Sequence, residues 1–143
     1  MVNVDLLKAH SGNYKLTKDN AAEIWKQLFT MHADMAPHFD AEYLDPEKIP
    51  KAQKFVMLGQ QMISIFSRLP AASADERQWR RSLAEFKEIF EDANAPLSEF
   101  NKLKDAFLEA MRIHAGGLSA EQKNEWGALI DKAYNDMKGF GWY

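Results

Sequence analysis

Apolar residues recur every three or four positions along most of the chain, which is the period of an α-helix with one buried face. No segment alternates apolar and polar residues for long enough to predict a strand. The broadest apolar face follows Asp45, where Phe55, Met62 and Leu69 share helical spacing. The pattern predicts six helices, approximately over residues 4–10, 20–29, 45–69, 73–90, 96–111 and 119–137.

Short polar motifs mark the ends of these predicted helices. Asp45-Pro46-Glu47 combines an N-cap, a proline at the first helical position and an acid in the first turn. Serine followed three residues later by Glu or Gln is typical of a capping box. The expected caps and stops are Asp19 or Asn20, the boxes Ser73–Glu76 and Ser119–Gln122, Pro70, and Gly116-Gly117.

The size and composition of the chain indicate one all-α domain over residues 1–143. Hydrophobic residues make up 46% and charged residues 27%, which is typical of a globular protein. The net charge of −3 provides no basic surplus for nucleic acid, and we expect the cluster Arg77, Arg80 and Arg81 to face water. The absence of cysteine excludes disulfides and thiolate chemistry.

Several classes of protein lack support in the sequence. No apolar run reaches the length of a membrane span, and the N-terminus shows no signal peptide. We therefore expect a soluble protein and favour a cytoplasmic location. No phosphate loop, nucleophile elbow or metalloprotease motif is present, so we expect no enzyme.

Three segments resemble the globin family, most closely the globins of nematodes. Residues 24–39, IWKQLFTMHADMAPHF, are similar to a globin's second helix and the following corner, with Phe39 at the phenylalanine that packs on the haem face. Residues 54–65, KFVMLGQQMISI, are similar to the long distal helix, and residues 119–134, SAEQKNEWGALIDKAY, to the start of the last helix. The resemblance implies a globin-like single-domain fold of six to eight helices.

In this resemblance, the residue that ligates the haem iron is missing. Phe90 falls on the proximal position, 32 residues after Leu58, and no histidine lies between Phe39 and Phe107. Leu58 takes the place of the distal histidine or glutamine. Because such proteins hold iron through one imidazole, we expect neither haem nor any other cofactor, and no oxygen binding.

The leading interpretation is a globin-fold protein that has lost haem ligation and acts as a binding or interaction protein. The alternative is a haem-binding globin for oxygen or another small ligand. In that case an unexpected residue holds the iron, or the haem is held weakly.

Seven apolar side chains are expected to converge where globins hold haem. They either pack to normal interior density or line an apolar cavity for a hydrophobic small molecule or lipid. These predicted site residues are Phe39, Leu58, Met62, Phe86, Phe90, Phe100 and Leu103.

The histidines and the C-terminus are the remaining candidates. The six-residue spacing of His32 and His38 does not place both on one helical face, so we expect rim histidines and no metal site. His10 and His114 have no second ligand nearby in sequence. The aromatic residues at 140–143 either fold back on the core, which we favour, or form an exposed contact patch.

Overall fold

The computed structural model describes residues 2–143, which form six α-helices, three short 3-10 helices and no strand. The predicted all-α fold is therefore confirmed. The α-helices are α1 (Val4–Gly12), α2 (Glu23–Met31), α3 (Gln53–Ala72), α4 (Glu76–Asp92), α5 (Leu103–His114) and α6 (Ala120–Gly139). The 3-10 helices are η1 (Ala33–Phe39), η2 (Pro46–Lys51) and η3 (Leu97–Lys102).

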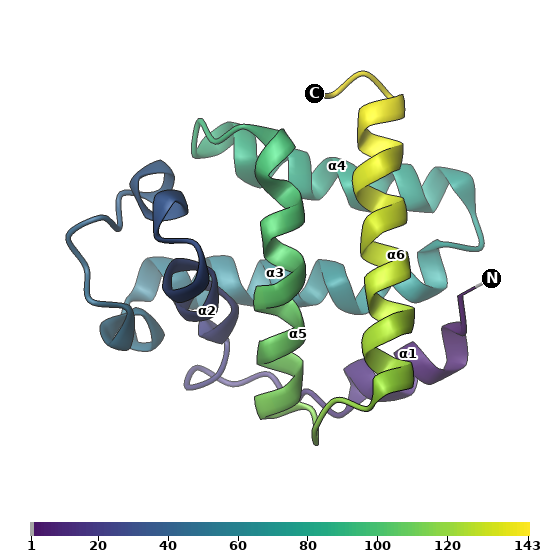
Figure 1. Cartoon of the computed structure of the whole chain (residues 1–143), viewed down its shortest axis with the longest axis horizontal. Coiled ribbons are helices and arrows are strands. Elements are labelled where there is room, and N and C mark those ends of the chain that lie inside the picture. Colours follow the sequence, from purple (N-terminus) through teal and green to yellow (C-terminus); the bar gives the residue numbers. More distant parts are fainter. Residues whose placement is uncertain (1) are drawn as a thin grey trace.

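The longer helices form two crossed layers. Figure 1 shows α5 and α6 side by side in front, running across α3 and α4 behind them. The short α2 packs on α5 and α3, while α1 contacts α3 and α6. None of the helices described for residues 2–143 is both long enough and apolar enough to cross a membrane.

Phenylalanine rings fill the space between these layers. Phe66 of α3 stacks on Phe107 of α5 with ring centroids 4.2 Å apart. Phe86 of α4 lies 4.9 Å from both Phe66 and Phe100, and all four side chains are at most 1% exposed. Since a large aromatic side chain buries roughly 150–250 Å², this cluster accounts for much of the contact between the layers.

Gly59 permits the closest approach between two helices. A β-carbon at this position would lie 1.9 Å from the carbonyl oxygen of Ala21, where α3 crosses the start of α2. Only glycine leaves room for the backbones to touch in this way. The crossing fixes the position of α2 above the first half of α3.

The helix predicted over residues 45–69 is divided in two. Ala52 has an extended backbone (ψ 116°) and separates η2 from α3. Pro50 has no N–H to donate and disfavours the α conformation at Ile49, so the first turn tightens to a 3-10 helix. Pro70 does not end α3 as predicted, because α3 continues to Ala72.

The cap of α4 also differs from the prediction. The carboxylate of Asp75 accepts hydrogen bonds from the backbone N–H groups of Arg77 and Gln78 at 2.9 and 3.1 Å. Ser73 instead donates its hydroxyl to the carbonyl of Pro70 at 2.6 Å. The predicted capping box is therefore wrong by two residues, because an ionised oxygen is the stronger acceptor at the positive end of a helix.

Of the predicted caps at the starts of α6 and α2, the first is confirmed and the second is wrong. Ser119 forms the predicted capping box at the start of α6. The prediction that Asp19 or Asn20 caps α2 is wrong, because Ala22 is the N-cap residue. Asn20 accepts from the N–H of Thr17 at 2.7 Å and so stabilises the preceding turn.

The aromatic C-terminus folds back, as favoured above. The hydroxyl of Tyr143 donates to the carbonyl of Tyr134 at 2.8 Å, and the two rings stack with centroids 5.0 Å apart. Burial and this hydrogen bond raise the pKa of Tyr143 to about 12. Arg80 of α4 lies 4.3 Å from the ring of Phe140 and 5.7 Å from that of Trp142, which ties the C-terminus to α4.

Candidate functional site

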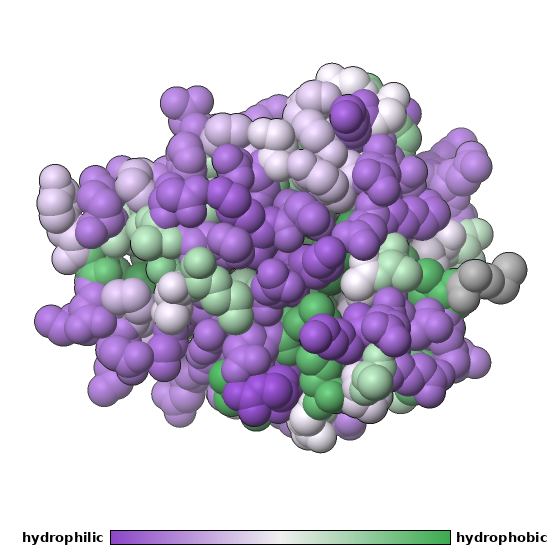
Figure 2. Space-filling view, in the orientation of Figure 1, coloured by the Kyte–Doolittle hydropathy of each residue, from purple (hydrophilic) through white to green (hydrophobic). Residues whose placement is uncertain are grey.

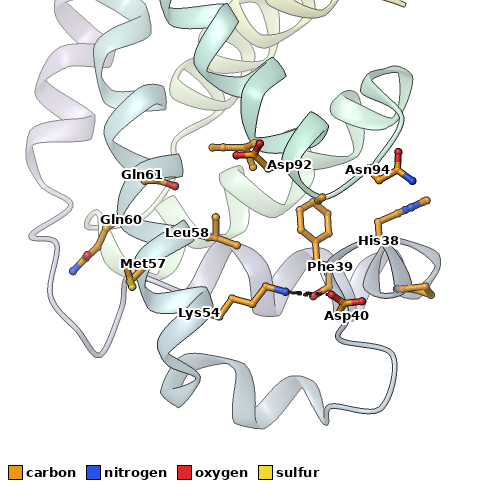
Figure 3. Close-up of a pocket in the computed structure, with 13 residues that line it drawn as sticks. His38, Phe39, Asp40, Lys54, Met57, Leu58, Gln60, Gln61, Asp92 and Asn94 are labelled. Carbon is orange, nitrogen blue, oxygen red and sulfur yellow. Dashed lines mark hydrogen bonds and ion pairs between the residues drawn. The ribbon is translucent and has the colours of Figure 1, made fainter.

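A surface cavity of about 820 Å³ lies between the corner that ends η1, the first half of α3 and the end of α4. Figure 3 shows its labelled side chains, with Leu58 and Phe39 around the central space and Asp92 above them. Cavities of roughly 300–1,000 Å³ are typical of sites for small molecules and cofactors. Its lining residues are Pro37, His38, Phe39, Asp40, Lys54, Met57, Leu58, Gln60, Gln61, Ile89, Asp92, Ala93 and Asn94.

Two residues on the rim of the cavity have an unusual backbone conformation. Asp40 (φ 57°) and Asn94 (φ 53°) are the non-glycine residues with positive φ among residues 2–143. Both side chains line the cavity. Asn94 follows the end of α4, where the N–H of Ala95 returns to the carbonyl of Phe90 at 2.8 Å. These left-handed turns end η1 and α4 sharply and so leave the cavity between them.

A lysine holds the corner side of the cavity in place. The ammonium of Lys54 donates to the carbonyl of Phe39 at 2.7 Å and lies 3.9 Å from the carboxylate of Asp40. Figure 3 shows this hydrogen bond, which links α3 to the corner that ends η1. The Lys54 side chain is half exposed, and its charge is shared with the carboxylate of Asp40.

The structure brings two of the seven predicted site residues to the cavity wall. These are Phe39 and Leu58, which face the space from opposite elements. The other five lie in the closed core and are at most 1% exposed. They are Met62, Phe86, Phe90, Phe100 and Leu103. Whether these seven residues contact a ligand stays a prediction.

The rings of Phe39 and Phe90 meet edge to face, with centroids 6.2 Å apart. Phe90 also contacts Phe100 at 6.2 Å, which supports it from the other side. A planar group inserted between two rings needs van der Waals contact on both faces, or about 7 Å in total. Binding between Phe39 and Phe90 therefore requires the two rings to move apart.

Sequence reasoning missed the polar rim of the cavity. Lys54, Gln61 and Asp92 fall on polar helix faces, where exposure is the usual outcome. They face one cavity only because α3, α4 and the corner meet, and no local pattern carries that information. His38 was expected at a rim and is a half-buried lining residue, whereas His32 does not line the cavity.

Two histidines make structural contacts that the sequence did not indicate. His10 is 1% exposed, with Nε2 2.8 Å from the carbonyl of Gly117 and Nδ1 3.0 Å from the indole nitrogen of Trp126. Because a carbonyl only accepts and an indole N–H only donates, Nε2 of His10 faces an acceptor and Nδ1 faces a donor. His114 lies 3.0 Å from the carboxylate of Glu23. Neither histidine faces the cavity.

Behind the wall formed by Phe39, the structure holds an unpaired donor. The side chain of Trp25 is fully buried, and its indole Nε1 has no hydrogen-bond partner within residues 2–143. The sequence showed Trp25 only as one apolar position of a helix. In the part of the chain described here, no group of three or more His, Cys, Asp or Glu side chains could hold a metal ion.

Comparison with known proteins shows the family to which the chain belongs. A sequence model of the globin family matches residues 22–137, which is most of the chain. The chain therefore belongs to the globin family, and the predicted globin-like fold is confirmed.

Solved structures give the same fold. A globin of Drosophila melanogaster has a TM-score of 0.74 at 17% identity, covering 92% of this chain and 88% of that one. A haemoglobin of the botfly Gasterophilus intestinalis has a TM-score of 0.74 at 16% identity, covering 92% and 91%. A hexa-coordinate haemoglobin of D. melanogaster, described for cyanide binding and transitions of its haem cavity, has a TM-score of 0.73 at 18% identity, covering 92% and 88%. A search of curated proteins gave no match.

These comparisons correct the prediction about the cofactor. Membership of the globin family and similarity to two haemoglobins point to haem, which contradicts the expectation of no cofactor. The expected absence of haem and oxygen binding receives no support from these comparisons. The error came from giving one position too much weight. A phenylalanine at residue 90 removes one potential bond to iron, but it does not remove the cavity or its apolar walls. The structural neighbours are insect globins, so the closer similarity to nematode globins stays a prediction.

The cavity suits the apolar ring system of a haem, but α4 does not provide the histidine that usually ligates the iron. The cavity volume and the apolar side chains of Phe39, Leu58 and Ile89 suit a flat hydrophobic group. The charge of Lys54 is offset by the carboxylates of Asp40 and Asp92, which also line the cavity. Helix α4 contains no histidine, so it offers no imidazole to a haem iron.

Proposed function

We propose that this protein is a haem-binding globin for a small ligand, in which α4 does not supply the iron ligand. The observation that carries the proposal is the cavity between α3, the end of α4 and the corner after η1. It combines apolar walls with a polar rim, and it is found in a chain of the globin family. A bound haem would supply an iron atom with a position for a diatomic ligand.

His38 is the proposed iron ligand. Among the lining residues it alone carries an imidazole, which is the usual ligand of haem iron in globins. Its side chain is half buried and has no hydrogen bond within residues 2–143. Figure 3 shows it on the corner side of the cavity, near Asn94. A free and accessible imidazole is therefore available at the rim.

The contact between Phe39 and Phe90 lowers the affinity for haem. Separating rings whose centroids lie 6.2 Å apart costs their mutual contact, worth about 0.5–1.5 kcal/mol for an aromatic pair. The protein is therefore expected to bind haem reversibly, without a ligand from the core side.

Absorbance of protein loaded with haem tests the proposal. We expect a Soret band that survives gel filtration in the parent protein and is shifted or lost in His38→Ala. His32→Ala is the matched control, because His32 lies at the other end of η1 and outside the cavity. A parent protein that leaves the column without haem would overturn the proposed function. Equal spectra in both variants would exclude His38 as the ligand.

An apolar ligand other than haem is the second candidate. Met57 is 58% exposed at the cavity, next to Leu58, so an apolar surface is open at the mouth. A fatty acid or similar hydrophobe would cover it. We also propose that the protein acts by binding and not as an enzyme, since the cavity shows no pairing of a nucleophile with a base.

A further inference from the structure

Tyr43 differs from the other tyrosines of the chain because its ring lies in water. The side chain is 98% exposed, and its hydroxyl has no hydrogen-bond partner within residues 2–143. A tyrosine stabilises a fold mainly by burying its ring, which removes roughly 150–250 Å² from water. Packing therefore does not explain a tyrosine at this position.

The hydroxyls of the other three tyrosines are all engaged with the backbone. Each donates to a carbonyl oxygen, Tyr14 at 2.6 Å, Tyr134 at 2.6 Å and Tyr143 at 2.8 Å. Their rings are buried or half-buried. An enzyme that modifies a phenol would first have to break these contacts, whereas the hydroxyl of Tyr43 is open to it.

Acidic residues flank Tyr43 on both sides along the chain. Asp40 and Glu42 precede it, Asp45 and Glu47 follow it, all four are exposed, and no lysine or arginine lies between them. Lysines of α3 and α2 offset Asp40 and Glu47 in part, at 3.9 and 3.4 Å, whereas Glu42 has no ion pair in the described part of the chain. Complementary charge steers a partner to such a segment, so a protein with a basic groove is favoured.

The backbone around Tyr43 is weakly held. Figure 1 shows the connection between η1 and η2 as an open loop at the left edge of the molecule. Among residues 42–45, the one backbone N–H that donates to a backbone carbonyl is that of Leu44, which bonds to Ala41 at 3.1 Å. Segments with few backbone hydrogen bonds open locally at low free energy. The loop can therefore extend into the groove of an enzyme without unfolding a helix.

We propose that Tyr43 is a phosphorylation site for a tyrosine kinase whose peptide-binding groove is basic. The phenolic oxygen of Tyr43 forms a bond to the γ-phosphorus of ATP, the bond from that phosphorus to its bridging oxygen breaks, and ADP leaves. The phenolic proton passes to a base of the kinase. The product adds about two negative charges shortly after Asp40, which lines the cavity. This inference goes beyond haem binding, because no step of it involves the cavity.

Phosphorylation of the folded, full-length protein tests the inference. The protein is incubated with a purified tyrosine kinase that prefers acidic peptides, together with magnesium and ATP. Trypsin then separates the four tyrosines, since cleavage after lysine and arginine leaves each in its own peptide. We expect phosphate to enter Tyr43 at least about tenfold faster than any other tyrosine, because the other hydroxyls must first leave their contacts. Tyr43→Phe should abolish this incorporation and unfold at the same urea concentration as the parent.

Two matched variants test the role of the neighbouring acids. Glu42→Gln and Glu121→Gln each remove one exposed charge, and Glu121 lies in the first turn of α6. We expect Glu42→Gln to lower kcat/KM for Tyr43 at least about threefold at low salt, and Glu121→Gln to change it by less than about 1.5-fold. The difference should shrink at high salt, because salt screens exposed charges.

Two results would overturn this inference. One is a folded protein in which Tyr43 is modified no faster than the other tyrosines, or not at all, while the same kinase phosphorylates its usual acidic peptide. The other is an equal rate in Glu42→Gln and Glu121→Gln, since the neighbouring acids would then play no part. A protein that takes up no haem would overturn the proposed function and leave this inference standing.

Discussion

At the scale of single residues, Phe90 controls how far the interior is closed beneath the cavity. Its ring contacts Phe39 at one edge and Phe100 at the other, and it is 1% exposed. Phe86, one turn earlier on α4, is equally buried but contacts Phe66 and Phe100. Replacing either residue should therefore cost a similar amount of stability, but Phe90 is the one of the two that contacts Phe39 on the cavity wall.

Phe90→His is expected to strengthen haem binding. The smaller ring opens space beside Phe39 and offers a nitrogen to iron, so the affinity for haem should rise at least about tenfold. The free energy of unfolding without haem should fall by about 3–5 kcal/mol, as for other large losses in a core. Haem titration followed by absorbance, together with urea unfolding, measures both quantities.

Phe86→His is the control for this prediction. It should lose similar stability and gain no affinity for haem, because its ring does not contact Phe39. Equal gains in both variants would show that loosening of the core, and not the position of the new imidazole, admits haem.

At the scale of the elements, the crossing of α2 and α3 depends on the absence of one methyl group. Gly59→Ala places a β-carbon 1.9 Å from the carbonyl oxygen of Ala21, and neither backbone is free to move without shifting a helix. We expect the free energy of unfolding to fall by more than about 3 kcal/mol, beyond ordinary overpacking. Because Trp25 and Leu58 flank this crossing, ligand binding should weaken as well.

Gly127→Ala is the matched control on another helix. Gly127 lies inside α6, and a β-carbon there would meet nothing within 4 Å. Alanine should raise the free energy of unfolding by about 0.5–1 kcal/mol through helix propensity. Urea unfolding measures both variants. A Gly59→Ala protein as stable as the parent would contradict the close crossing seen in the structure.

At the scale of the whole molecule, aromatic contacts run without a break from the C-terminus to the cavity wall. Tyr143 stacks on Tyr134, and Tyr134 on Phe100 at 6.4 Å, from which Phe90 leads to Phe39. The core is therefore closed without a cofactor, so the haem-free protein should unfold in one cooperative transition. Binding of haem should add stability by mass action, about 2.7 kcal/mol at a free concentration of 100 times the dissociation constant.

Coincident loss of far-UV and near-UV circular dichroism in urea would check this prediction. The structure also indicates what a failure of this prediction would mean. A haem-free chain without a near-UV transition, which gains one when haem is added, would mean that the contact between Phe39 and Phe90 does not hold the interior together.

The sequence by itself determined the class of fold and some of the helix ends. Six apolar faces at helical spacing, the capping box at Ser119 and the glycine pair at 116–117 depend on neighbours within a few residues, so local physics sufficed. Ser73 and Asp75 were competing candidates for the cap of α4, and Pro50 changed the start of a predicted α-helix into a 3-10 helix. In both places the local sequence pattern was compatible with more than one backbone conformation.

Only the tertiary structure decided which side chains share the candidate site. Phe39 and Leu58 line the cavity, while the other five predicted residues fill the core, because α4 brings Phe90 against Phe39. The unpaired N–H of Trp25 and the paired N–H of Trp126 cannot be told apart in sequence, since the acceptor on His10 is 116 residues away. Periodicity fixes which face of a helix is buried, but burial against a particular partner depends on how all the helices pack.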